Sequence, residues 1–82
     1  MSPFKSREEV ESKMQGYLSI SPSYWSLMNE DERKGYSFWK DHLEYCFKRY
    51  NFDGCKRAMD MIDNITALAL NRAYPQMNLF TT

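Results

Sequence analysis

Three side chains of the types that bind metal ions lie near the middle of the chain: His42, Cys46 and Cys55. On a helix His42 and Cys46 would be one turn apart, and a short turn between two helices would bring Cys55 opposite Cys46. Imidazole and thiolate are good zinc ligands, but a structural zinc takes four ligands, and this spacing matches no familiar zinc pattern. Cysteines on facing apolar stripes are more often small core residues. We therefore expect two reduced thiols in a core, with no metal and no other cofactor.

Groups suited to catalysis are few. His42 is the only histidine, and its neighbour Asp41 would point about 100° away around a helix, so the two cannot form a dyad. Asp60 and Asp63 are three residues apart and could meet, but they fall on the expected polar side of their helix. The three glycines are scattered and form no phosphate-binding loop. The sequence thus predicts no catalytic residues and a protein that is not an enzyme.

Basic and aromatic residues alternate around a predicted turn: Lys48, Arg49, Tyr50, Phe52, Lys56 and Arg57. Proteins that bind single-stranded nucleic acid combine these residue types. The same mixture also arises when cations at a helix end meet core aromatics at a tight turn. Weak nucleic-acid contact through Lys48, Lys56 and Arg57 therefore stays as one alternative.

Four helices are predicted to position these residues, over about 7–18, 22–28, 30–50 and 52–73. The first begins with the capping box of Ser6 and Glu9, and the second with Ser21 before a proline. Asn29 can cap the third helix and either Asn51 or Asp53 the fourth, which Tyr74-Pro75 ends.

The two longer helices each carry an apolar stripe at helical spacing. The first stripe comprises Tyr36, Trp39, Leu43, Cys46, Phe47 and Tyr50, and the second comprises Cys55, Ala58, Met59, Ile62, Thr66, Ala69 and Ala73. A connection of only two or three residues predicts an antiparallel hairpin. The expected fold class is all-α, a small bundle built on this hairpin, with a helical domain over 1–74 and a tail over 75–82.

A second face runs along the hairpin more than 100° from the main stripe. It comprises Phe38, Tyr45, Arg49, Met61 and Leu68. Aromatic residues, Met and Arg are enriched at the centres of protein interfaces. Alternatively, the first helix and the stretch YWSLM could cover these side chains, and the sequence leaves both interpretations open.

Composition narrows the class of partner. The 82 residues leave room for one domain with a thin core, and such domains often gain stability by association. The net charge of zero argues against a strongly basic nucleic-acid binder and favours association, including a homodimer. No apolar run is long enough to span a membrane and no signal peptide is recognisable, so we expect a cytoplasmic protein without membrane contact.

The stretch QMNLF, residues 76–80, resembles the pentapeptide with which bacterial polymerases and repair proteins bind the sliding clamp of DNA replication. The pattern of that family is a glutamine, a variable aliphatic residue, a small polar residue and Leu-Phe. The resemblance covers these five residues only. It implies that Leu79 and Phe80 enter an apolar pocket of the clamp, that Gln76 hydrogen-bonds at its rim, and that Met77 fills a lesser subsite.

The leading expectation is a small non-enzymatic accessory or inhibitor protein that attaches to the bacterial sliding clamp through its tail. Its helical domain would then bind one further protein. The alternative is a helical protein-interaction module, either a homodimer or an inhibitor of a larger enzyme of the kind that phages encode. In that alternative Leu79 and Phe80 fold back into the protein's own core.

Overall fold

Each helix is preceded by a capping residue whose side chain accepts a hydrogen bond from a backbone N–H of the first turn. In the computed structural model, which describes residues 4–75, the helices are α1 (Arg7–Leu18), α2 (Pro22–Leu27), α3 (Glu30–Lys48) and α4 (Phe52–Ala73). Their caps are Ser6, Ser21, Asn29 and Asn51. The all-α fold is confirmed, and α3 ends two residues earlier than predicted.

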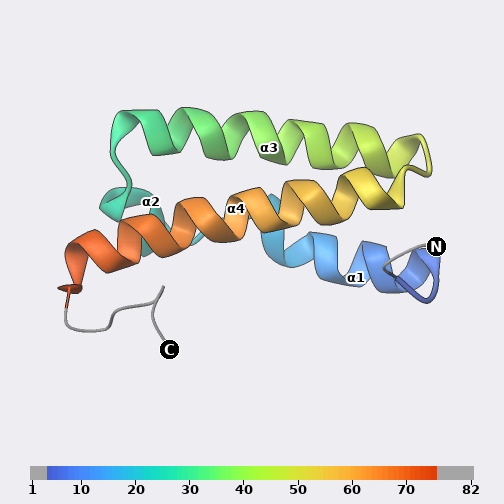
Figure 1. Ribbon diagram of the computed structural model, residues 1–82, viewed down its shortest axis with the longest axis horizontal. Helices are drawn as coiled ribbons and strands as arrows, with labels where there is room; N and C mark the ends of the chain where they lie inside the picture. Colours follow the sequence, from blue (N-terminus) through green and yellow to red (C-terminus); the bar gives the residue numbers. More distant parts are fainter. Residues whose placement is uncertain (1–3, 76–82) are drawn as a thin grey trace.

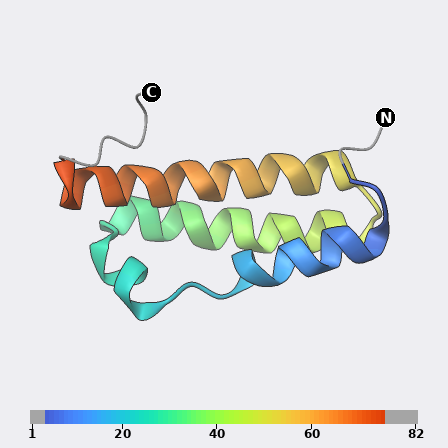
Figure 2. The same ribbon diagram turned by 90° about the horizontal axis from the view of Figure 1, so that it is seen from below.

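The antiparallel pair α3 and α4 forms the centre of the fold, and α1 and α2 lie along one side of it (Figure 1). Helix α1 contacts both long helices, whereas α2 packs against α4 near its C-terminal end. Figure 2 shows the same arrangement from below, with α1 beside the turn of the hairpin and α2 beside its open end. The hairpin therefore has one covered side and one side that neither short helix covers.

The turn between α3 and α4 is held by two backbone hydrogen bonds. Asn51 N–H donates to Cys46 C=O at 2.8 Å and Tyr50 N–H donates to Phe47 C=O at 3.1 Å, which is the Schellman pattern. Tyr50 has φ 59°, the left-handed conformation that this motif requires and that glycine usually supplies. Tyr50 is consequently 66% exposed, so its predicted place in the apolar stripe was wrong.

Small residues let the two long helices approach closely. Leu43, Cys46 and Cys55 are almost fully buried in the seam, where the Cys55 thiol lies 3.9 Å from Leu43 C=O. A Cβ on Gly54 would lie 2.6 Å from Cys46 Sγ, and a Cβ on Gly35 would lie 3.1 Å from the end of the Ile65 side chain. The buried hydrophobic residues of α1, α3 and α4 join Phe4 and Met28 in one core cluster.

Arg72, in the last turn of α4, ties three helix ends together. Its guanidinium donates to both carboxylate oxygens of Glu32 at 2.6 and 2.8 Å and to Leu27 C=O at 2.9 Å. Glu32 also completes the capping box of α3, because its side chain accepts from the backbone N–H of Asn29 at 2.9 Å. These bonds fix the open end of the hairpin to α2.

Among residues 4–75, no helix combines the length and the apolar character that crossing a lipid bilayer would require.

The glycines Gly16 and Gly54 should respond oppositely to substitution by alanine. An added Cβ at Gly16 meets nothing within 4 Å, so Gly16→Ala should stabilise the fold by about 0.5–1 kcal/mol through helix propensity. At Gly54 the Cβ would collide with Cys46 Sγ and with the amide of the cap residue Asn51, so Gly54→Ala should cost about 1–3 kcal/mol. Chemical denaturation of the two variants measures both changes, and a stable Gly54→Ala would contradict the close seam.

The Glu32–Arg72 pair should make stability depend on pH. The hydrogen bonds from Arg72 lower the pKa of Glu32 below its ordinary value, outweighing the opposite effect of burial. A carboxyl group with a lowered folded pKa stabilises the protein above its unfolded pKa, and this contribution is lost as pH falls through the folded pKa. Glu32→Gln should therefore lower the melting temperature by a few degrees at neutral pH, and by less at about pH 3.

The matched control is the exposed pair Lys56–Asp60, whose atoms are 2.6 Å apart on one face of α4. Because both side chains are about half exposed, Asp60→Asn should change the melting temperature little at either pH. Equal effects of Glu32→Gln and Asp60→Asn would show that Arg72 does not secure the open end.

Candidate functional site

The side of the hairpin away from α1 and α2 carries a row of aromatic side chains with other residues beside it, which we call the aromatic face. It comprises Phe38, Trp39, His42 and Tyr45 of α3, the C-cap residue Arg49, and Met61 and Leu68 of α4. The five residues that the sequence placed on a second face all belong to it. Phe38 is 60% exposed, Tyr45 55% and Leu68 50%, so the described part of the chain leaves this face open to solvent.

The position of this face follows from helical periodicity. On α3, Tyr36 and Phe47 face α1, because Tyr36 OH donates to Tyr17 C=O and the Arg7 guanidinium lies 4.4 Å from the Phe47 ring centre. Phe38 follows Tyr36 by two residues and Tyr45 precedes Phe47 by two. Each is therefore rotated by about 200° from the side that α1 covers.

Helical periodicity also decides on which side of α4 Met61 and Leu68 lie. Asp63 faces α1, since Tyr17 OH donates to its carboxylate at 3.0 Å, and Thr66 lines the same side. Met61 precedes Asp63 by two residues and Leu68 follows Thr66 by two, which again turns both by about 200°. Met61 is half-buried, whereas Leu68 is 50% exposed. The interpretation that α1 and the YWSLM stretch cover this face is wrong.

The rings of α3 contact one another along the helix. Phe38 meets Trp39 edge to face with ring centres 5.0 Å apart and lies parallel to the His42 ring at 6.1 Å. His42 lies edge to face with Trp39 at 5.4 Å and nearly parallel to Tyr45 at 6.4 Å. Mutual packing restricts these side chains before any partner arrives, and less conformational entropy is then lost on binding.

A cation extends the row of rings toward the hairpin turn. The Arg49 guanidinium lies 4.9 Å from the centre of the Tyr45 ring. Sequence reasoning selected Arg49 but missed His42 and Trp39, which it assigned to a metal alternative and to the core. Their spacing could have revealed them, because His42 lies four residues after Phe38 and three before Tyr45.

The thiols and the imidazole do not assemble a metal site. His42 Nε2 lies 3.4 Å from Cys46 Sγ, but no group of three or more His, Cys, Asp or Glu side chains close enough to hold a metal occurs within residues 4–75. Burial raises the pKa of the Cys46 thiol, and burial together with Cys46 raises that of Cys55 to about 11. Both cysteines are free and buried, as expected of core residues.

Asp60 and Asp63 of α4 bind different partners. Asp60 pairs with Lys56 Nζ at 2.6 Å, while Asp63 accepts from Tyr17 OH. Asp60 is thus a solvated surface carboxylate, as predicted, but Asp63 takes part in the contact between α1 and α4. No local pattern predicts this contact, because Tyr17 lies 46 positions earlier in the chain.

The basic residues of the nucleic-acid-binding alternative lie around the hairpin turn. Lys48, Lys56 and Arg57 are all exposed, and Lys56 is engaged by Asp60. The Tyr50 ring, on which a base could stack, already carries the Arg7 guanidinium 5.1 Å from its centre. This corner therefore offers fewer free cations and rings than the sequence suggested.

The tail residues of the clamp-binding pattern, Gln76, Met77, Leu79 and Phe80, lie outside the described residues. What the structure does describe is the end of the helix before them. Tyr74 N–H donates to Leu70 C=O at 2.8 Å, and Pro75 follows the last helical turn.

Comparison of the chain with models of protein families, with curated proteins and with solved structures gives no match. The aromatic face and the sequence of the tail are therefore the two features of this chain from which a function can be proposed.

Proposed function

We propose that this chain is a small, non-enzymatic protein-binding accessory or inhibitor protein of the cytoplasm. Its aromatic face binds a protein partner, and its tail attaches it to the bacterial sliding clamp. The observation that carries the first part is the exposure of Phe38, Tyr45 and Leu68 on the side of the hairpin that α1 and α2 leave open.

The energetics favour a protein as the occupant of this face. Burying a Phe or Leu side chain contributes about 1.5–3 kcal/mol. Trp39, His42 and Met61 of this face are half-buried. Phe38 and Tyr45 are exposed beside them, and Arg49 lies at one end. This is the composition of interface hot spots, in which aromatic and Arg anchors dominate and their neighbours exclude water.

A second copy of the chain and a larger protein are the two partners to separate first. The net charge of zero leaves no long-range repulsion between copies, which supports a homodimer. Sedimentation velocity over a range of concentrations distinguishes the two: a dimer that dissociates in Phe38→Ala/Tyr45→Ala identifies a second copy, whereas a monomer requires a different protein.

The aromatic face should be the region of the chain that captures a partner in its native host. A photo-reactive benzoylphenylalanine in place of Phe38 should cross-link to one dominant protein. The same residue in place of Gln15, exposed on α1, should not. Tyr45→Ala should reduce the cross-link at position 38 by about tenfold while the melting temperature stays nearly constant, because the side chain is exposed. Equal cross-linking from positions 15 and 38 would contradict the proposal.

Attachment to the clamp is the part of the proposal that the tail supports. The pattern QMNLF follows Pro75, at which the helical bundle ends. Leu79 and Phe80 contribute about 1.5–3 kcal/mol each when buried in the clamp, and ordering the peptide takes back a few kcal/mol. With polar contacts from Gln76, the balance suits micromolar binding, about −8 kcal/mol.

Leu79→Ala combined with Phe80→Ala should abolish binding to a purified bacterial sliding clamp, measured by calorimetric titration of the full chain. The melting temperature should stay almost unchanged, because the proposal places both side chains in the clamp. The matched control, Thr81→Ala with Thr82→Ala, changes two residues beyond the pattern and should bind normally. A fall of many degrees in the Leu79/Phe80 variant would instead assign both side chains to the protein's own core.

A further inference from the structure

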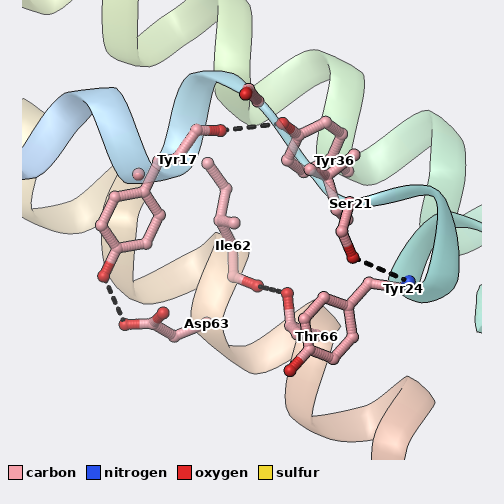
Figure 3. A pocket seen from close by; sticks show the side chains of 10 residues that line it. Tyr17, Ser21, Tyr24, Tyr36, Ile62, Asp63 and Thr66 are labelled. Atoms are coloured by element: carbon pink, nitrogen blue, oxygen red, sulfur yellow. Dashed lines mark hydrogen bonds between the residues drawn. The ribbon is translucent and has the colours of Figure 1, made fainter.

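A pocket of about 310 Å³ opens on the covered side of the hairpin, where α1, α2, α3 and α4 meet (Figure 3). Its walls include Tyr17, Tyr24, Tyr36, Ile62, Asp63 and Thr66. In the view of Figure 3, Tyr17 and Tyr24 lie on either side of Ile62. The size falls at the lower end of the range for small-molecule sites. The pocket shares no lining residue with the aromatic face, and a role for it would be additional to the proposed function.

Three tyrosines from three helices contribute to the walls, and two of their hydroxyls are already engaged. Tyr36 OH donates to Tyr17 C=O at 2.8 Å, and Tyr17 OH donates to Asp63 at 3.0 Å. Burial and the bond to Asp63 raise the pKa of Tyr17 to about 12, so this hydroxyl remains a donor at neutral pH. Tyr36 and Ile62 are each only 4% exposed, so a ligand meets mainly the aromatic rings of Tyr17 and Tyr24.

Charge is one-sided in this pocket. Asp63 is the only ionised side chain among the described residues that line it. Tyr17 occupies Asp63 Oδ2, and Oδ1 has no hydrogen-bond partner among residues 4–75. None of the Lys and Arg residues between positions 4 and 75 lines the pocket, and Thr66 Oγ1 donates back to Ile62 C=O at 3.0 Å. The arrangement thus offers aromatic surface and one carboxylate, with no cation to neutralise it.

The rim of the pocket is open where α1 carries Gly16. A Cβ at this position would contact nothing within 4 Å, so no packing requirement accounts for a glycine inside the helix. The residue leaves the approach to Tyr17 clear.

We propose that this pocket binds an alkylammonium group, a cation surrounded by methyl or methylene carbons. Electron-rich ring faces attract such cations, and tyrosine is one of the residues that form cages around quaternary ammonium groups. The carboxylate of Asp63 supplies the opposite charge, and the apolar wall accepts the carbons that surround the nitrogen. A neutral ligand of the same shape would remove water from that carboxylate without supplying an opposite charge.

The test titrates the full ¹⁵N-labelled chain with choline and with its uncharged isostere, neohexyl alcohol, in which a tert-butyl group replaces the trimethylammonium group. Amide shifts of Tyr17, Tyr24 and Thr66 report binding. Choline should bind at about millimolar concentration or tighter, and at least about tenfold more tightly than the alcohol. Equal binding of the two probes, or no binding of choline, would overturn the proposal.

Two variants examine the residues that carry it. Asp63→Asn keeps the shape and an acceptor for Tyr17 OH but removes the charge, and Tyr24→Leu removes an exposed ring. Each should weaken choline binding by about fivefold or more. Asp60→Asn, which removes the same charge one turn away and does not line the pocket, should change it less than twofold. Equal effects of Asp63→Asn and Asp60→Asn would show only general electrostatic attraction and would overturn the site.

The ammonium group could belong to a free amine or to a modified lysine side chain, and a second arm distinguishes the two. A peptide that contains trimethyl-lysine is titrated beside the free amino acid. Binding of either with the Asp63 dependence supports the proposal, and tighter binding of the peptide assigns the cation to a protein. Circular dichroism confirms that each variant is folded before its affinity is compared.

Discussion

The close approach of α3 and α4 is the constraint on which the other features depend. Small residues at the seam, among them Gly35, Gly54 and Ala58, let the two long helices pack along their length. The Schellman turn at Tyr50 closes one end and the Glu32–Arg72 pair closes the other. With the hairpin fixed at both ends, every side chain of α3 and α4 is assigned to one of two sides. Both candidate binding regions are consequences of this assignment.

The two sides differ because α1 and α2 are enough to cover only one of them. Among residues 4–75 no helix covers the second side, and the aromatic residues on it stay exposed. Phe38 and Tyr45 differ from Tyr36 and Phe47 by two helical positions each, yet the first pair faces solvent and the second is buried. Aromatic residues thus lie on both sides of α3, packed against α1 on one side and, among residues 4–75, exposed on the other.

Much of the fold could be predicted from local signals. The caps Ser6, Ser21 and Asn29 and the proline at position 75 set helix ends within about two residues, and the spacing of apolar positions gave the hairpin. Errors came from contacts between distant segments. The bond from Tyr17 to Asp63 and the tie from Arg72 to Glu32 join residues 40 or more positions apart, and neither leaves a periodic pattern. The pocket could not be predicted either, because residues of four helices line it and they are far apart in the sequence.

Arg72 also has a consequence for cooperativity within the molecule. Because one guanidinium bonds to the end of α2 and to the first turn of α3, neither can separate from the last turn of α4 without breaking charged hydrogen bonds. These three helix ends therefore form one local unfolding unit. Tyr24 of the pocket belongs to α2, which Arg72 joins to the last turn of α4. A ligand that held α2 in place would therefore also oppose fraying of the C-terminal end of α4.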